Sequence, residues 1–148
     1  MKKILTVLAI CCLSYTTFAQ SDIICIVFQE STNTENMIRH TARENYNTQL
    51  YRDQPHTFSV KQGGVIRHFS YANLHSQPDE PVQTQPVSFL KSIDNIDWNN
   101  SIMNYSTTEF YNFLTSLELY DKVYFIDRAE IKDGMMKMYP VKEFKPGY

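Results

Sequence analysis

Two adjacent glycines, Gly63 and Gly64, divide a segment of alternating polar and apolar residues, HTFSVKQGGVIRHFSY (56–71). Glycine adopts positive φ at no steric cost, and such a pair between alternating segments is typical of a two-residue β-hairpin turn. The turn places Phe58 opposite Phe69, so that one face is mainly aromatic and the other mainly polar. We therefore predict an antiparallel pair of strands with one buried face.

A second hairpin is predicted at Asp133-Gly134, a residue pair that suits the same kind of turn. Pairing outwards from the turn sets four pairs of residues opposite one another. The apolar members then share one face, and the charged members form complementary pairs on a solvent-exposed face. The predicted pairs are Ile131 with Met136, Glu130 with Lys137, Ala129 with Met138, and Arg128 with Tyr139.

Alternation along the same strand places Asp127 on the apolar face, where an unpaired carboxylate is costly. A bulge, a strand end or a partner must therefore accommodate it. An arginine partner would make Asp127 structural, and this is the favoured interpretation. A pocket shared with a histidine would instead make Asp127 the best acid/base candidate in the chain.

The remaining elements follow from apolar spacing and helix-capping residues. The run 22–28 is almost wholly apolar and rich in β-branched residues, which predicts a central strand with Cys25 buried in it. Apolar residues at four-residue spacing predict a helix over about 32–50, and Pro86 suits the start of a short helix over 86–93. The clearest helix begins at Ser106, which forms a capping box with Glu109 and buries Phe110, Phe113, Leu114 and Leu117.

Together these elements predict an α+β fold. We expect a single domain with a largely antiparallel sheet, two β-hairpins, and two to three helices packed on one face of the sheet.

The first residues, MKKILTVLAICCLSYTTFAQSD, have the layout of a secretory signal peptide. We expect residues 1–19 to be removed, and 20–148 to form a soluble exported domain that is periplasmic or secreted. The apolar run is shorter than the roughly 20 residues that span a bilayer, and no second run of that length follows. No membrane span is therefore expected in the mature chain.

Removal of the signal peptide changes both the charge and the cysteine content. Loss of Lys2 and Lys3 lowers the 14 basic side chains to 12 against 16 acidic ones, a net charge of about −4. This charge argues against a nucleic-acid partner, because such partners are bound through phosphate contacts. Two of the three cysteines lie in the signal peptide, so Cys25 alone remains and no intramolecular disulfide is expected.

The sequence lacks the local motifs of common catalytic and cofactor sites. It has no G-x-S-x-G elbow, no phosphate-binding P-loop and no G-x-G-x-x-G segment. The four histidines, His40, His56, His68 and His75, show no zinc-site spacing, and the predicted hairpin places His56 and His68 on opposite faces. No metal or cofactor is predicted, and a non-enzymatic role is favoured.

The longest irregular segment, ANLHSQPDEPVQT (72–84), has prolines on both sides of an acidic pair. Long loops often carry recognition, and tyrosines are common at protein interfaces. We therefore predict a binding or interaction module of the bacterial envelope, such as an inhibitor or immunity-like partner of another envelope or secreted protein. The candidate binding residues are Tyr71, His75, Pro78, Asp79, Glu80 and Pro81.

The alternative hypothesis is a small envelope hydrolase or metal-dependent enzyme. It would use histidine and carboxylate side chains that are distant in sequence but converge in the fold. The acid/base candidates for this alternative are His68 and Asp127.

Overall fold

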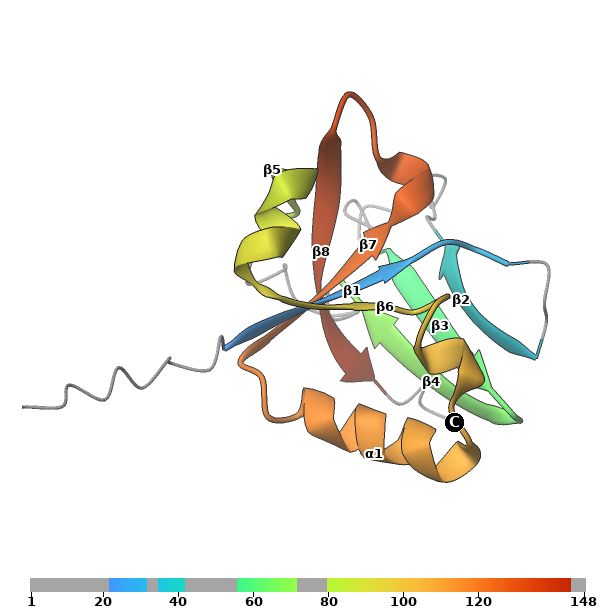
Figure 1. Ribbon diagram of the computed structural model, residues 1–148. Coiled ribbons are helices and arrows are strands. Elements are labelled where there is room, and N and C mark those ends of the chain that lie inside the picture. The colour runs from blue at the N-terminus through green and yellow to red at the C-terminus, as the bar shows by residue number, and fades with distance from the viewer. Residues whose placement is uncertain (1–21, 32–34, 42–55, 72–79, 145–148) are drawn as a thin grey trace, which may run out of the picture.

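The computed structural model describes residues 22–31, 35–41, 56–71 and 80–144, and these form a mostly β structure (Figure 1). The described strands are β1 (Ile23–Phe28), β2 (Asn36–Thr41), β3 (Thr57–Gln62), β4 (Val65–Ser70), β5 (Gln83–Pro86), β6 (Asp94–Asp97), β7 (Lys122–Asp127) and β8 (Met135–Phe144). The described helices are α1 (Thr107–Leu117) and the 3₁₀ helices η1 (Val87–Ser92), η2 (Ile102–Asn104) and η3 (Arg128–Glu130).

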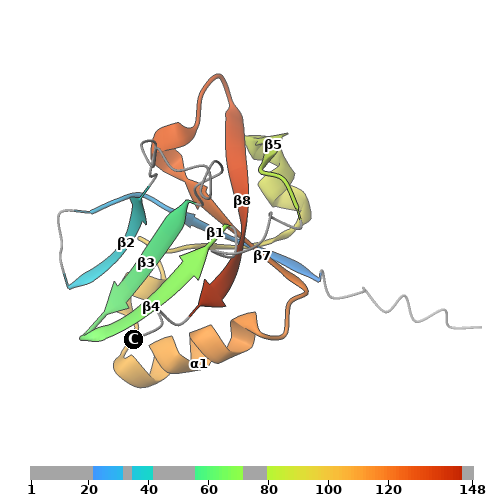
Figure 2. The same cartoon turned by 180° about the vertical axis from the view of Figure 1, so that it is seen from behind.

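The eight described strands form one curled sheet with the order β2-β3-β4-β8-β7-β1-β6, and β5 pairs with β8 outside this path. The strand β1 lies between β7 and the edge strand β6 and runs parallel to both, whereas the other pairings are antiparallel. Two views related by 180° show the sheet curling into a half-barrel, with β3 and β4 on the opposite side of the molecule from β1 and β6 (Figures 1 and 2). The concave side of this curl holds most of the core.

The predicted fold class is wrong. The sheet is a half-barrel with one α-helix in the described residues, not a sheet with two to three helices packed on one face. Much of the core is instead enclosed by the sheet itself, because its curl brings the inner faces of β1 and β3 together. Phe28 and Phe58 accordingly lie with their ring centroids 5.8 Å apart in an edge-to-face arrangement.

The helix predicted over 32–50 is wrong for 36–41, which form the edge strand β2; residues 32–34 and 42–50 lie outside the described part of the chain. Ile38 is buried and Arg39 is exposed, and Ile38 pairs directly with Val60 of β3. The four-residue spacing from Ile38 was therefore a coincidence. Burial against β3 determined the local structure, since tertiary pairing overrides weak propensity.

The hairpin at Gly63-Gly64 is confirmed, including its register. Both glycines have positive φ (54° and 83°), and Phe58 pairs with Phe69. The rings of these two phenylalanines are buried, whereas Ile66 on the other face is 50% exposed.

The second turn is confirmed but the predicted strand register is wrong. Asp133 and Gly134 have φ of 52° and 71°, as the turn requires. Tyr139, however, pairs with Phe125 rather than with Arg128, a displacement of three residues. The 3₁₀ helix η3 takes up these residues, and β5 replaces them as the partner of Met135–Met138.

The helix that begins after Ser106 is confirmed together with its capping box. The Ser106 side chain accepts a hydrogen bond from the Glu109 N–H, and the Glu109 carboxylate accepts one from the Ser106 N–H at 2.7 Å. The apolar face of α1 packs on the core next to Trp98 and Phe125. Its buried residues are Phe110, Phe113, Leu114 and Leu117, as predicted.

The strand expected over 22–28 is confirmed as β1, and its two faces contribute to two apolar clusters. It is not central in the sheet, because it lies between β7 and the edge strand β6. Cys25 is fully buried in one of these clusters and is a free thiol. Within the described ranges no disulfide is formed, and no helix is both long and apolar enough to cross a membrane. Residues 1–19, including Cys11 and Cys12, lie outside these ranges, so the signal peptide stays a prediction.

Candidate functional site

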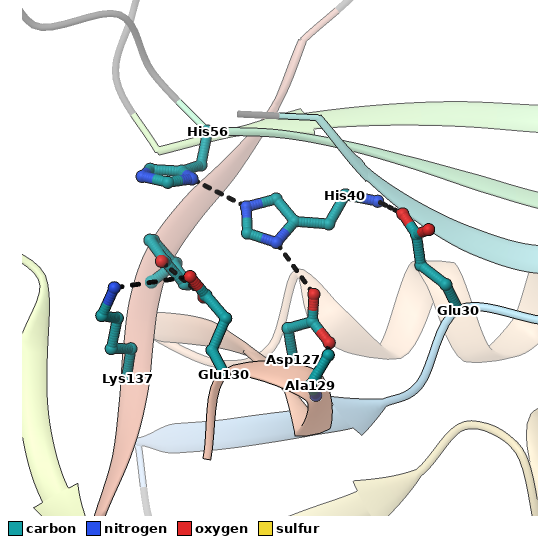
Figure 3. Close-up of polar contacts among 8 residues, drawn as sticks. Glu30, His40, His56, Asp127, Ala129, Glu130 and Lys137 are labelled. Carbon is teal, nitrogen blue, oxygen red and sulfur yellow. Dashed lines mark hydrogen bonds and ion pairs between the residues drawn. The ribbon is translucent and has the colours of Figure 1, made fainter. Parts of the chain in front are cut away.

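Asp127, His40 and His56 form a continuous chain of hydrogen bonds (Figure 3). His40 Nδ1 lies 3.0 Å from Asp127 Oδ2, and His40 Nε2 lies 2.7 Å from His56 Nδ1. The three side chains come from the end of β7, from the edge strand β2, and from the residue before β3. We refer to them as the Asp127–His40–His56 chain.

Asp127 is positioned by the end of its strand. β7 ends at Asp127, which caps the N-terminus of η3 by accepting a hydrogen bond from the Ala129 N–H at 2.9 Å. The adjoining Arg128 turns away from Asp127 and pairs with Asp97. A strand end and a histidine partner therefore accommodate the carboxylate on the apolar face, and no arginine contact to it is seen among the described residues.

His40 is held between strands and aromatic rings. It lies directly opposite Phe58 in the β2–β3 register, and the two rings stack with centroids 4.5 Å apart. Tyr139 packs against its edge at 5.2 Å, so the side chain is only 7% exposed. Its backbone N–H donates to the Glu30 carboxylate at 2.8 Å, which occupies part of the open edge of β2.

The Asp127 carboxyl is ionised at neutral pH. Burial alone would raise its pKa, but the hydrogen bonds from His40 and from the Ala129 N–H outweigh burial, so that the pKa lies below the usual aspartate value. An ionised carboxylate only accepts hydrogen bonds, so His40 Nδ1 carries the hydrogen that points at Asp127. In the neutral pair, His40 Nε2 then accepts a hydrogen bond from His56 Nδ1–H.

A second polar group borders the two imidazole rings. The Tyr139 ring lies 4.3 Å from the His56 ring, and its hydroxyl donates to Glu130 at 2.6 Å. Lys137 lies 3.4 Å from the other oxygen of Glu130, so the predicted Glu130–Lys137 contact is present (Figure 3). Burial and the bond to Glu130 raise the pKa of Tyr139, which therefore stays protonated at neutral pH.

The predicted acid/base pair of His68 and Asp127 is not brought together. His68 pairs with Ser59 in the β3–β4 register, on the opposite face from Phe58, and its Nδ1 lies 3.2 Å from Ser59 Oγ. Asp127 at the end of β7 contacts His40 of β2 on the inner face of the sheet. His68 and Asp127 therefore lie on different sides of the sheet.

Tyr71 and Glu80, two of the predicted binding residues, contact neighbouring strands. The Tyr71 hydroxyl accepts a hydrogen bond from the Val82 N–H at 3.2 Å. The Glu80 carboxylate accepts bonds from Tyr124 and Gln83, and lies 3.1 Å from the Lys122 ammonium. Of the other candidates, Pro81 is exposed, whereas His75, Pro78 and Asp79 lie outside the described residues.

Sequence reasoning missed His40 and His56 as a pair for identifiable reasons. His40 was placed in a helix, where it had no defined neighbour on a sheet. His56 was correctly placed on the aromatic face of the hairpin, beside Phe58. Had 36–41 been recognised as a strand, its alternation would have put His40 on the same face as Ile38, next to that aromatic face.

Within the described ranges of the protein, no group of three or more histidine, cysteine, aspartate or glutamate side chains is arranged to hold a metal ion. The Asp127–His40–His56 chain is therefore a series of hydrogen bonds rather than a metal-coordination shell.

The other face of the hairpin forms a separate surface. In Figure 2 this face is turned towards the viewer, and none of the described helices lies over it. Arg39 is exposed, Ile66 is 50% exposed, and the Lys61 ammonium lies 3.8 Å from the Glu35 carboxylate. We define the outer β2–β4 face by two cross-strand rows, Arg39 with Ser59 and His68, and Met37 with Lys61 and Ile66.

Comparison of the chain with models of protein families, with curated proteins and with solved structures finds no match.

Proposed function

We propose that this chain is an exported, non-enzymatic binding module of the bacterial envelope that recognises another exported protein through the outer β2–β4 face. The observation that supports this proposal is the 50% exposure of Ile66, which lies close to the hairpin turn on the outer side of β4, beside the basic Lys61. An apolar side chain ringed by polar groups is typical of the centre of a protein interface.

The charge of this face indicates the chemistry of the partner. Arg39 and Lys61 lie on it, and Lys142 follows in the next cross-strand row, whereas Glu35 is the acidic residue beside Lys61. This face therefore carries three basic side chains beside one acidic one, although the processed chain as a whole is expected to be acidic. We therefore expect an acidic partner surface, bound faster and more tightly at low ionic strength.

The test compares two exposed apolar residues on different surfaces. Ile66→Asp introduces a charge on the outer β2–β4 face, and Leu119→Asp does so after α1, where Leu119 is 79% exposed. The tagged variants are crosslinked in their own cell envelope, and the partner captured by wild type is quantified by mass spectrometry. We expect Ile66→Asp to lower capture at least about fivefold, the loss expected at an interface centre, and Leu119→Asp to leave it unchanged.

An equal effect of the two variants would contradict this assignment of the surface. A second measurement uses Arg39→Glu, which should weaken capture and flatten its dependence on salt. Capture that is unaffected by both Ile66→Asp and Arg39→Glu would place the interface elsewhere on the chain.

A second candidate function is a small envelope hydrolase, and the contact between Asp127 and His40 favours it. Buried ionisable pairs cost desolvation energy and cluster at functional sites. The test is hydrolysis of p-nitrophenyl acetate by the purified protein, compared with free imidazole at the same concentration. A rate no greater than that of imidazole would count against an activated histidine.

A further inference from the structure

We propose that Glu35 is an internal competitor for the partner of the outer β2–β4 face. Glu35 holds the Lys61 ammonium until the partner supplies a carboxylate of its own. That carboxylate lies between two apolar side chains of the partner, which contact Met37 and Ile66. The inference rests on the proposed function and deepens it, because it states which chemical groups the partner carries and which contact the partner displaces.

Lys61 lies between two apolar residues in one cross-strand row. It is opposite Met37 in the β2–β3 register and opposite Ile66 in the β3–β4 register. Directly opposite residues have Cβ atoms about 5 Å apart on the same face of the sheet. The basic side chain therefore has an apolar neighbour on each side, and a complementary surface carries an acidic group between two apolar ones.

The contact between Lys61 and Glu35 is loose. Glu35 directly precedes β2, its side chain is 72% exposed, and its carboxylate lies 3.8 Å from the Lys61 ammonium. This distance exceeds the range of about 2.7 to 3.2 Å for a hydrogen bond. An exposed ion pair of this kind changes an equilibrium constant by a factor of about five or less, so a partner can displace Glu35 at little cost.

The Lys61 ammonium keeps its capacity to donate hydrogen bonds. It has three N–H donors, and it donates none of them at hydrogen-bond distance within the described part of the chain. The ammonium groups of Lys122 and Lys137 lie closer to their carboxylates, at 3.1 and 3.4 Å. The Lys61 side chain is nevertheless only 27% exposed. A carboxylate at hydrogen-bond distance would therefore pair a charge that is already partly removed from water.

The surface around Leu119 lacks this combination of groups. Leu119 is 79% exposed, but it follows Glu118 and is separated from Asp121 by one residue, and both acidic residues are exposed. These charges would repel an acidic segment. An exposed apolar residue next to an ammonium that donates no hydrogen bond thus distinguishes the outer β2–β4 face, and Glu118 provides a control for changes at Glu35.

The first experiment uses an end-blocked peptide of defined sequence, acetyl-Leu-Ser-Glu-Ser-Leu-amide, as the probe. Alternation in an extended chain places its glutamate and both leucines on one side. The peptide is titrated at millimolar concentration into the isotope-labelled protein, and binding is read from the amide chemical shifts of Lys61 and Ile66. We expect the peptide to bind at least about threefold more tightly than its glutamine analogue, because a charged acceptor strengthens the bond to an ammonium. Equal affinity of the two peptides, or no shift at these residues, would overturn the proposal.

The second experiment tests the competition between Glu35 and the peptide. Glu35→Gln should tighten binding of the glutamate peptide about two- to fivefold, the range expected for loss of an exposed ion pair. Glu118→Gln removes the same charge at the end of α1 and should leave the affinity unchanged. In a Lys61→Gln background, Glu35→Gln should have no effect, because Glu35 acts through Lys61. Circular dichroism and thermal unfolding first establish that each variant is folded.

An equal gain from Glu35→Gln and Glu118→Gln would overturn the competition, because it would show an effect of net charge alone. Failure of the proposed function has a different signature. If Ile66→Asp leaves the crosslinked partner at the wild-type level, the outer β2–β4 face is not the interface. If Ile66→Asp lowers capture whereas Glu35→Gln and Lys61→Gln change neither capture nor peptide affinity, only the roles of Glu35 and Lys61 are refuted.

Discussion

His40 and Asp127 are hydrogen-bonded at 3.0 Å, although three strands, β3, β4 and β8, separate their own strands in the sheet order. In a flat sheet, four strand spacings of about 4.8 Å would hold them about 19 Å apart. The curl of the half-barrel brings the edge strand β2 back over the end of β7 (Figure 2). This contact therefore couples the closure of the fold to the protonation of two side chains.

Breaking this contact from one side should destabilise the protein. His40→Leu leaves the Asp127 carboxylate buried without the hydrogen-bond donor that His40 supplies. We expect a loss of about 3 kcal/mol in the free energy of unfolding. The cost should be smaller by about 1 to 2 kcal/mol when Asp127→Asn is already present, because contacting residues are energetically coupled. Urea unfolding of the four proteins measures this coupling.

The control for this cycle is His68→Leu on the outer face, which should cost less than about 1 kcal/mol because the half-buried His68 side chain is not the partner of a buried carboxylate in the described contacts. An identical cost of His40→Leu in both Asp127 backgrounds would show that the hydrogen bond contributes nothing to stability.

Acidification should weaken the fold in part through Asp127. Its pKa is lower in the folded state than in the unfolded chain, where it is near 3.8. The resulting stabilisation is fully present above that unfolded value and is lost as the pH falls through the folded pKa. We therefore expect the urea concentration at the unfolding midpoint to decrease as the pH is lowered below about 4, and to decrease less in Asp127→Asn.

Part of the acid sensitivity of the fold should persist in Asp127→Asn. Burial opposes ionisation of Glu80 and Asp97, yet their hydrogen-bonded partners, led by Tyr124 and Arg128, lower their pKa values as well. Identical acid profiles for wild type and Asp127→Asn would contradict the contribution assigned to Asp127.

The capping box of α1 should be measurable by a single substitution. Ser106→Ala removes the hydroxyl that accepts from the Glu109 N–H, and we expect a loss of about 1 kcal/mol in the free energy of unfolding. Thr108→Ala is the matched control, since Thr108 is exposed in the first turn and has no capping role. Thermal unfolding in which both variants match wild type would refute the contribution of the cap.

Cys25 should be chemically inert in the folded protein. Its side chain is fully buried, and burial raises the pKa of the thiol to about 12, so almost no thiolate exists at pH 8. We expect iodoacetamide to leave Cys25 unmodified in the native state and to alkylate it in concentrated urea, as read by peptide mass spectrometry. Rapid native labelling would indicate that β1 opens frequently.

Features defined by neighbouring residues in the chain were predictable. The turn at Gly63-Gly64 needs positive φ at two adjacent positions, and the capping box at Ser106 needs two side chains three residues apart. Each depends on local backbone chemistry, so each is confirmed. The register across Gly63-Gly64 is confirmed too, because a tight turn without an interruption leaves one alignment of the strands.

The second hairpin shows where this local reasoning ends. Its turn at Asp133-Gly134 was predicted, but η3 interrupts the strand before the turn, and β5 pairs with β8 in place of those residues. The competing strand β5 lies far away in sequence. Its preference for β8 is a matter of packing that no local pattern contains.

The sequence by itself therefore determined the turns, the helix α1, the buried strand β1 and the aromatic face that carries His56. The tertiary structure alone decided that 36–41 is a strand, that the sheet curls into a half-barrel, and that His40 bridges Asp127 and His56. The physical reason is the range of the interactions. Turns and caps are set by bonds between near neighbours, whereas strand pairing and curl depend on the burial of side chains that are distant in the chain.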